Sequence, residues 1–495
     1  MGRLRWSIAV VGGLCVVFVA MTLSARGSGP SRIEPDIDTY PEFDVSIHDY
    51  VARCDGPFEL TARPGAGERA SIAGSPFAEG PLTRRVRRIA GERVKVTFRT
   101  DGPASDRSYS IRCLPRDFPV WTFDRERRPL RPFYLFQTGM LDHGGYMAIY
   151  NRQGTPVWWM PAPSPVFTGV FSDNTVARSR FPGPRFAENK DRHFERFTLS
   201  GRHLRSVRGK DGPIDSHDIQ RLPNGNFMAM VLQVRKGIDL TRFGGPPNAF
   251  VLGIELEEIT PSGKVMWTWN NRGHIGLEET GRWWPSVLGN TTKIGKGRVA
   301  YDIGHPNSID VTRKSVIISF RHNDAIYRID RRTGDIVWKL GGTPTPESLK
   351  VTGPDPFRNY PLAGQHDARV IGHSLLSIHD NGAELNRPPR GVAYRIDTRR
   401  GTARFVGEQR EPGIKLALGI GSATYYPDGG WLLNIGNSKY ATEYDAAGVC
   451  TFRFSQFFRG SSVPAYRATA FGRGRFRPEQ LRRAMDGVAR KRAAG

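Results

Sequence analysis

The fold is decided by the stretch Ile329–Trp338 (IDRRTGDIVW), in which a strand ends in a polar turn, a glycine closes the turn and an aromatic residue follows four positions later. Glycine supplies the positive φ that tight hairpin turns need, and the alternation after it points the later side chain into a core between sheets. The same shape recurs along the chain. Its six glycines and their partners are Gly154 with Trp158, Gly201 with Arg205, Gly263 with Trp267, Gly334 with Trp338, Gly401 with Phe405, and Gly448 with Phe452.

These glycines are separated by 47, 62, 71, 67 and 47 residues, which is about the length of a four-stranded blade with its loops. Six such units in series predict an all-β fold, a six-bladed β-propeller over residues 119–456. A stacked β-solenoid is the alternative, although its repeats would be shorter and more regular. The content of 56 glycines and 36 prolines in 495 residues also favours a turn-rich β protein over a helical bundle.

The N-terminal 25 residues have the pattern of a membrane segment. Arg3 and Arg5 precede an apolar run from Trp6 to Ala25 that carries no charge and is long enough to span a bilayer. The leading arginines favour a cytoplasmic N-terminus, so residues 1–25 are predicted to form a transmembrane helix that anchors an exported protein in the cell membrane. A cleaved signal peptide, and hence a secreted protein, stays open as the alternative, although Leu23–Ala25 is a poor cleavage site.

Between this segment and the propeller, we expect a polar linker over residues 26–42 and a small β-sandwich-like domain over residues 43–118. The second part alternates apolar and polar residues in short stretches, as in Arg93–Phe98. Cys54 and Cys113 flank this part, and in an exported chain we expect them to form a disulfide. Two buried free thiols are the alternative.

The chain is strongly basic, with 72 Lys and Arg residues against 48 Asp and Glu and a formal net charge of +24. Such a balance suits anionic ligands, anionic lipids or nucleic acid, and export argues against nucleic acid as a partner. Residues 457–495 are predicted to be a basic C-terminal tail with a short helix from Pro478. A solvated tail and a contact with anionic lipid or cell-surface polymer are both compatible with its charge.

Three blocks place a histidine near the start of a predicted innermost strand: residues 216–226 (SHDIQRLPNGN), 304–310 (GHPNSID) and 364–370 (GQHDARV). Because innermost strands converge on the central channel of a propeller, we expect His217, His305 and His366 to face one cavity. Arg321, in a fourth block at residues 319–324 (SFRHND), is expected near the same opening.

Neutral histidines beside an arginine suit the transfer of a phosphoryl or sulfuryl group. An imidazole can attack the electrophilic centre and hold the group covalently, arginine can bind its oxygens, and a second histidine can protonate the leaving alkoxide. Three histidines could also bind a metal, but no carboxylate is clearly placed to complete the shell, so no metal is predicted. No phosphate loop or nucleotide fingerprint occurs in the sequence, and no cofactor is predicted.

These blocks, together with the stretch from Ser319 to Gly342, resemble those of the bacterial arylsulfotransferases in order and approximate spacing over residues 130–456. Members of that family are exported six-bladed propellers that move sulfate from one phenol ester to another phenol without a nucleotide sulfate donor. The resemblance therefore implies an aryl sulfate donor and a phenol acceptor.

The resemblance also implies roles for individual residues. His366 would be the histidine that is transiently sulfated. The sulfuryl oxygens and the leaving phenol would be handled by His217, His305, Asn307 and Arg321, and the hydroxyls of Ser422 and Thr424 would line the far wall. Two other interpretations stay open: a propeller that binds a quinone cofactor, because Ile329–Trp338 is similar to a tryptophan docking repeat, and a noncatalytic scaffold of the cell envelope.

Overall fold

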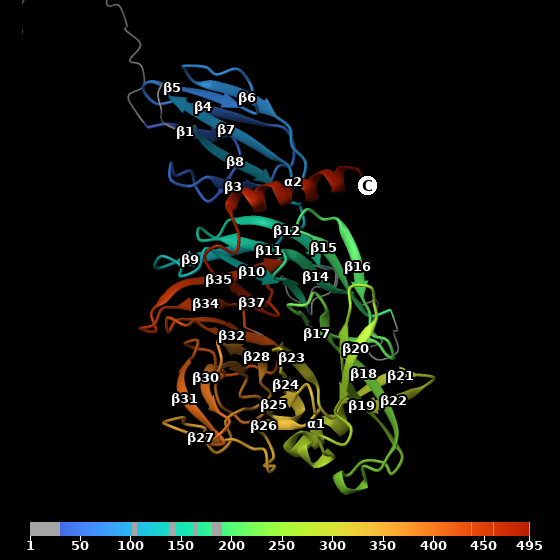
Figure 1. Ribbon diagram of the computed structural model, residues 1–495. Helices are drawn as coiled ribbons and strands as arrows, with labels where there is room; N and C mark the ends of the chain where they lie inside the picture. Colours follow the sequence, from blue (N-terminus) through green and yellow to red (C-terminus); the bar gives the residue numbers. More distant parts are fainter. Residues whose placement is uncertain are drawn as a thin grey trace, which may run out of the picture.

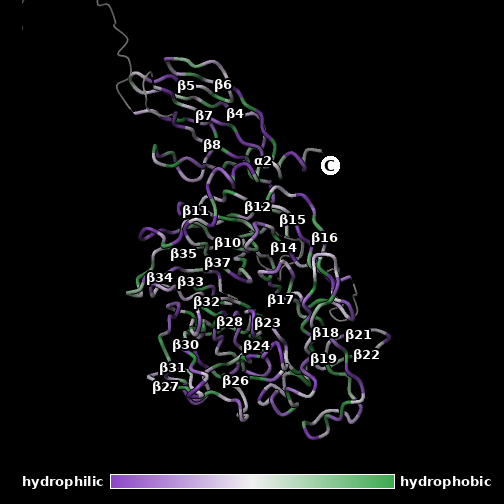
Figure 2. The backbone as a smooth tube through the Cα atoms, in the orientation of Figure 1, coloured by the Kyte–Doolittle hydropathy of each residue, from purple (hydrophilic) through white to green (hydrophobic). Residues whose placement is uncertain are grey.

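The computed structural model describes residues 30–100, 106–137, 145–162, 167–180, 191–436, 438–458 and 460–494, which form an all-β protein with few helices. Figure 1 shows a small N-terminal β domain beside a much larger assembly of sheets. Hydrophobic and hydrophilic stretches alternate along the strands of both parts (Figure 2).

The N-terminal domain consists of two sheets with a shared core. Its first sheet contains β1 (Arg32–Pro35), β4 (Phe58–Arg63) and β6 (Leu82–Val86). Its second contains β2 (Thr39–Tyr40), β3 (Asp49–Ala52), β8 (Arg107–Cys113), β7 (Arg93–Thr100) and β5 (Glu68–Ile72). Leu60 of the first sheet and Val96 of the second lie in the same buried cluster. The prediction of a linker over residues 26–42 was wrong for β1 and β2, because the alternation in β1 buries Ile33 in this core.

The predicted disulfide between Cys54 and Cys113 is confirmed, with 5.4 Å between the two Cα atoms. Cys113 ends β8, and Cys54 lies just beyond β3, the strand that pairs with β8 in parallel. The bond therefore fastens the ends of two neighbouring strands in the second sheet of the N-terminal domain.

The larger part contains six successive, mainly antiparallel sheets, which we number 1 to 6 and describe from the innermost strand outward. Sheet 1 contains β37 (Ala468–Phe471), β10 (Phe133–Gln137), β11 (Gly145–Asn151) and β12 (Pro156–Ala162). Sheet 2 contains β13 (Thr168–Val170), β14 (Thr175–Arg180), β15 (His193–Thr198) and β16 (His203–Val207). Sheet 3 contains β17 (Ile214–Arg221), β18 (Phe227–Ile238), β19 (Ala249–Ile259) and β20 (Val265–Asn270), with β21 (Thr291–Gly295) and β22 (Arg298–Tyr301) added beside β19.

The second half repeats this plan. Sheet 4 contains β23 (Pro306–Val311), β24 (Ser315–Phe320), β25 (Ala325–Asp330) and β26 (Ile336–Gly341). Sheet 5 contains β28 (His366–Ile371), β29 (Leu375–Asp380), β30 (Arg390–Asp397) and β31 (Thr402–Gln409), with β27 (Lys350–Thr352) beside β31. Sheet 6 contains β32 (Gly421–Tyr425), β33 (Trp431–Ile435), β34 (Ala441–Tyr444) and β35 (Cys450–Phe458), with β36 (Ser461–Ser462) and β9 (Val120–Arg125) beside β35. The connections carry the helical turns η1 (Thr241–Phe243), η2 (Leu277–Trp283), α1 (Trp284–Gly289) and η3 (Arg321–Asn323).

The repeated turn from which the fold was predicted joins the last two strands of every one of these six sheets. All six of its glycines have φ between 60° and 90°, a conformation that favours glycine. Trp158 and Trp338 are buried, and the indole Nε1 of Trp158 donates to the carbonyl of Leu199 at 2.8 Å. Leu199 belongs to the corresponding turn of sheet 2, so the repeat also ties one sheet to the next.

Side chains on the innermost strands hold neighbouring sheets in register. The Asp218 carboxylate on β17 accepts the backbone N–H of Ile309 on β23 at 3.0 Å. The Ser308 hydroxyl on β23 accepts the N–H of Ala368 on β28, also at 3.0 Å. Because these bonds join strands of different sheets, they fix where the residues at the start of each innermost strand lie.

The helix predicted to begin at Pro478 is present, but the described residues of 457–495 do not form a solvated tail. The strand β37 is the innermost strand of sheet 1 and pairs with β10, more than 300 residues earlier. The helix α2 (Pro478–Ala494) then lies between sheet 1 and the N-terminal domain (Figure 1). Leu481, Met485 and Val488 recur at helical spacing and are buried in the core of sheet 1, so the basic residues mark only the other faces of the helix.

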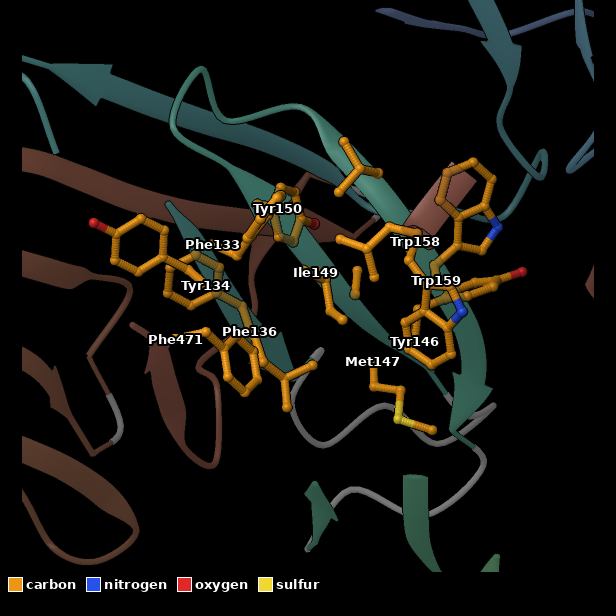
Figure 3. Close-up of a cluster of buried hydrophobic side chains, with 14 of the residues drawn as sticks. Phe133, Tyr134, Phe136, Tyr146, Met147, Ile149, Tyr150, Trp158, Trp159 and Phe471 are labelled. Carbon is orange, nitrogen blue, oxygen red and sulfur yellow. The ribbon is translucent and has the colours of Figure 1, made fainter. Parts of the chain in front are cut away.

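This core is dominated by aromatic side chains. Figure 3 shows Phe136, Tyr150 and Trp158 among them, and the rings of Phe136 and Phe454 stack with centroids 3.9 Å apart. The Asp486 carboxylate of α2 binds Arg93 and Arg112 of the N-terminal domain at 2.9 and 2.8 Å. α2 therefore joins the N-terminal domain to the sheets by apolar packing on one face and ion pairs on another.

The predicted membrane segment over residues 1–25 lies outside the described residues. Among the residues that are described, no helix is long and apolar enough to cross a membrane.

Candidate active site

The three predicted histidines lie near the start of three neighbouring innermost strands. His217 is on β17, His305 immediately precedes β23, and His366 is the first residue of β28. The rings of His217 and His305 are 5.1 Å apart between centroids, and the ring of His322 lies 4.9 Å from that of His305. Burial is the largest cause that lowers the pKa of His366, which also lies close enough to Arg321 and His305 for their charges to lower it further. The histidine positions that the sequence singled out therefore come together at one end of sheets 3, 4 and 5.

Two of these histidines are each oriented by an aspartate that precedes them in the chain. Nδ1 of His217 lies 2.7 Å from the Asp215 carboxylate, and Nδ1 of His305 lies 2.7 Å from the Asp302 carboxylate. An imidazole that donates Nδ1–H to a carboxylate interacts with a ligand through Nε2. Burial opposes the ionisation of Asp302, but the charge of His305 and its hydrogen bond hold the pKa of Asp302 below its ordinary value.

His366 has a different environment, because its partner is an amide rather than a carboxylate. Its Nδ1 lies 2.8 Å from Oδ1 of Asn381 and 3.0 Å from the carbonyl oxygen of Gly364. Its Nε2 accepts the backbone N–H of Ile420 at 3.2 Å. Burial, and after it the charge of Arg321, lowers the pKa of His366 well below 6.5. His366 is therefore a neutral imidazole whose lone pair is on Nε2.

Arg321 forms the wall between His366 and the other histidines. It lies in η3, and its guanidinium stacks over the ring of Trp283 at 4.2 Å. One nitrogen donates to Nε2 of His322 at 2.7 Å and the other to the carbonyl of Leu418 at 2.9 Å. Burial is the largest cause that lowers the pKa of His322, to about 3, so this ring is neutral beside the guanidinium.

The donor set around Asp302 is poorly suited to a metal ion. Ligand atoms of Asp302, His305 and His322 lie within 4.8 Å of one another. However, Nδ1 of His305 is already paired with the Asp302 carboxylate, and Nε2 of His322 accepts a hydrogen bond from Arg321. A cation here would displace these bonds and face the positive guanidinium, so we assign the cluster to orienting the histidines.

Asn307, Ser422 and Thr424, which were predicted to bind substrate, occupy innermost strands. The Asn307 amide donates to the carbonyl of Gln365 at 2.7 Å, and the Ser422 hydroxyl accepts the N–H of Ala468 at 2.9 Å. Both contacts join neighbouring sheets, while Thr424 is half-buried two residues further along β32. Their roles toward a substrate stay predictions.

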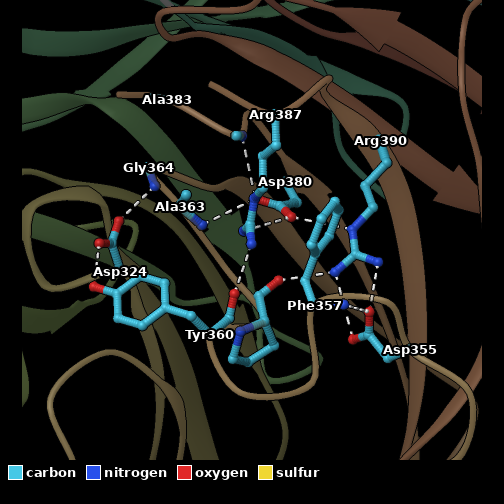
Figure 4. A network of polar contacts seen from close by, with 12 residues as sticks. Asp324, Asp355, Phe357, Tyr360, Ala363, Gly364, Asp380, Ala383, Arg387 and Arg390 are labelled. Atoms are coloured by element: carbon cyan, nitrogen blue, oxygen red, sulfur yellow. Dashed lines mark hydrogen bonds and ion pairs between the residues drawn. The ribbon is translucent and has the colours of Figure 1, made fainter. Parts of the chain in front are cut away.

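An extended set of carboxylates supports the segment that leads to His366. Asp324 accepts hydrogen bonds from Trp283 Nε1 at 2.9 Å, the Tyr360 hydroxyl at 2.7 Å and the N–H of Gly364 at 2.6 Å. Asp380 accepts the N–H of Ala363 and binds two buried arginines (Figure 4). Asp324 thus fixes Trp283, over which Arg321 stacks. It also fixes Gly364, whose carbonyl oxygen lies 3.0 Å from Nδ1 of His366.

Sequence reasoning missed the residues that orient the site: Asp215, Asp302, His322, Asp324 and Asn381. A local signal existed for two of them, because each aspartate stands two or three residues before its histidine. His322 and Asp324 lie in the quoted block around Arg321, yet nothing in that block tells which polar residue faces the cavity. Asn381 follows β29 and meets His366 only through the pairing of β28 with β29.

The comparisons with solved structures give low similarity. A protein of unknown function from Bacteroides caccae is 11% identical, with a TM-score of 0.39, over 68% of this chain and 98% of that one. A catalytically inactive variant of virginiamycin B lyase from Staphylococcus aureus, solved with quinupristin, is 13% identical, with a TM-score of 0.34, over 70% of this chain and 89% of that one. No curated protein matches the chain.

The comparison with protein families is more specific. The sequence model described as arylsulfotransferase (ASST) matches residues 197–457, which is more than half of the 495 residues. The matched region contains His217, His305, Arg321 and His366, the side chains that the structure gathers at one end of sheets 3 to 5. The chain therefore belongs to the arylsulfotransferase (ASST) family.

Proposed function

We propose that the protein transfers a sulfuryl group from an aryl sulfate to a phenolic acceptor by a ping-pong mechanism through a sulfated His366, with no nucleotide sulfate donor and no cofactor. The observation that carries this proposal is the state of His366. It is buried and neutral, and its Nδ1 is fixed by Asn381 so that the lone pair is on Nε2, the atom required of a nucleophile.

In the first half-reaction, Nε2 of His366 attacks the sulfur and the bond from sulfur to the phenolic oxygen breaks. The phenolate leaves with both electrons of that bond and takes a proton from His217 or His305, whose Nδ1 atoms are held by carboxylates. Arg321 binds the equatorial oxygens as charge develops on them. The second half-reaction is the reverse with a new phenol, which restores His366 and returns the proton.

The test is transfer from 4-nitrophenyl sulfate to a second phenol with purified protein and no added cofactor. We expect 4-nitrophenolate release that depends on the acceptor and does not change with added quinone or calcium. Activity that requires quinone and calcium would instead favour the cofactor-binding propeller, and the absence of turnover with a panel of phenols would favour a noncatalytic scaffold.

We also propose that the six sheets close into a six-bladed propeller outside the cytoplasm, anchored by residues 1–25 or secreted after their removal. The pairing of β37 with β10, which completes sheet 1 from both ends of the region, supports closure. The Cys54–Cys113 disulfide supports an oxidising compartment. Protease added to intact cells should digest the propeller, whereas complete protection would contradict this location.

A further inference from the structure

A tripeptide in the loop between β31 and β32 bonds to the candidate active site through its first and last residues. We call Leu418–Ile420 the gate segment. The carbonyl of Leu418 accepts from Arg321 at 2.9 Å, and the N–H of Ile420 donates to Nε2 of His366 at 3.2 Å. The carbonyl of Ile420 accepts from the Asn381 amide at 3.0 Å. One tripeptide therefore engages the proposed nucleophile, its orienting amide and its arginine at once.

The gate segment also fills the space that a sulfate ester would need. A Cβ added to Gly419 would lie 3.9 Å from Cε1 of His366 and 4.0 Å from Nε of Arg321, so the backbone passes between the two side chains. His366 is only 3% exposed. An ester cannot bring its sulfur to Nε2 while the segment is in this position.

The hydrogen bonds of the gate segment occupy the two groups that a sulfuryl group would engage, the guanidinium of Arg321 and Nε2 of His366. The Leu418 carbonyl places a neutral oxygen on Arg321, where an anionic oxygen would form a stronger, charge-assisted bond. The Ile420 N–H occupies the lone pair that must attack sulfur. These contacts keep buried polar atoms paired, and an ester would replace them.

The backbone around the gate segment is built so that displacement costs little. Ile420 has φ of +51°, which is strained for a β-branched residue, and glycines lie on both sides of it. The Leu416 and Leu418 side chains are 54% and 56% exposed, so they do not hold the loop in the core. The apolar contacts of the loop with the core come from Ala417, immediately before the segment, and from the partly buried Ile414.

We propose that Leu418–Ile420 is a gate that covers His366 and Arg321 and is displaced by the anionic sulfuryl group of the donor. This inference rests on the proposed function, because it assigns Arg321 and His366 to one sulfuryl group. It adds that donor binding requires the Leu418 carbonyl to leave Arg321 and the Ile420 amide to leave His366.

Amide hydrogen exchange of the full chain, with inorganic sulfate as the probe, tests the gate. We expect sulfate to speed exchange in peptides containing Ile420, because that amide loses its acceptor, and to slow exchange near Arg321. Exchange that slows near Arg321 and is unchanged at Ile420 would overturn the gate and leave the anion site intact. No response in either region would overturn the anion site of the proposed function and the gate with it.

Gly436→Ala should hold the gate open. A Cβ at Gly436 would overlap the carbonyl oxygens of Gly419 and Ile420. We expect fast exchange at Ile420 without sulfate and a lower sulfate concentration at half-saturation. Gly407→Ala is the matched control, because a Cβ there meets nothing within 4 Å. Unaltered exchange at Ile420 in folded Gly436→Ala would contradict the proposal.

Ile420→Gly provides an independent variant that should favour the closed gate. Glycine relieves the strain at φ of +51°, so sulfate should need a concentration about 5-fold higher to bind. Leu416→Gly adds similar backbone freedom to the same loop at a residue without positive φ, and it should not raise that concentration. Equal effects of the two substitutions would show that loop flexibility alone is responsible and would overturn the gate.

Discussion

The hydrogen bond from Nδ1 of His366 to Asn381 determines which nitrogen of that ring can attack a substrate. A neutral amide fixes the tautomer without adding charge, whereas His217 and His305 have carboxylate partners. This difference gives His366 a role different from that of His217 and His305. Burial lowers the pKa of His366 and its amide partner adds no charge, so this ring remains a neutral nucleophile. His217 and His305, whose Nδ1 atoms face carboxylates, are assigned the role of acid by this geometry.

His366→Asn should abolish both half-reactions, because it keeps a polar side chain of similar length and removes the nucleophile. In the protein without substitutions, the donor alone should produce a sulfated imidazole that is labile in acid and stable in base. Mass spectrometry of protein quenched at alkaline pH after donor addition locates the adduct. An adduct on His217 or His305 would refute the assignment, and steady turnover without any adduct would favour direct transfer between bound substrates.

In the pH–rate profile of the first half-reaction, Asn381→Asp should shift the acid limb to higher pH. Burial lowers the pKa of His366, so the neutral ring persists below pH 6.5, and a carboxylate at residue 381 would favour the protonated, unreactive form. Asn381→Ser is the control, because it removes the orienting amide without adding charge. It should lower the rate. The pH dependence of 4-nitrophenolate release in a single turnover measures both, and an unmoved limb in Asn381→Asp would contradict a nucleophilic His366.

At the scale of elements, the sequence predicted what is local. The turn glycines were identifiable because a tight hairpin requires positive φ at a single residue. All six glycines have positive φ. The C-terminal region was misinterpreted because its role depends on a distant partner: β37 pairs Phe471 with Phe133. Charge counting along the chain also missed that Leu481 and Met485 form the buried face of α2.

Asp486→Ala should destabilise the protein, because it leaves Arg112, whose side chain is 6% exposed, without its carboxylate. Removing one partner of a buried pair costs about 3–5 kcal/mol, and we expect about 2–3 kcal/mol here because Asp486 is 22% exposed. Glu479→Ala, in the same helix, is the control: that carboxylate is 61% exposed, so its loss should change stability by less than about 0.5 kcal/mol. Urea unfolding measures both, and equal effects would contradict the docking role of α2.

At the scale of the whole molecule, the site is assembled from residues that no local pattern connects. The three histidine blocks could be aligned because each begins an innermost strand, but the gate segment comes from the loop before sheet 6 and bonds to sheets 4 and 5. Loops have no repeating pattern, so their contacts follow only from how the sheets are arranged in space. The sequence therefore located the histidines and not the backbone that covers them.

The burial that keeps His322, His366 and His379 neutral should make the fold sensitive to acid. Burial lowers the pKa of His322 to about 3 and that of His379 to about 4, from an ordinary value of 6.5. Between pH 6.5 and 4 the unfolded chain therefore binds more protons than the folded one, so the stability present above pH 6.5 is lost as the pH falls. Together with His366, whose pKa burial also lowers well below 6.5, these groups predict a loss of up to about 4 kcal/mol per pH unit. The free energy of unfolding in urea at pH 7.5, 6.5, 5.5 and 5.0 measures this slope. His322→Gln should reduce the slope by about a third, whereas His203→Gln on the exposed side of β16 should leave it unchanged. Equal slopes in all three proteins would show that burial of His322 does not govern the response to acid.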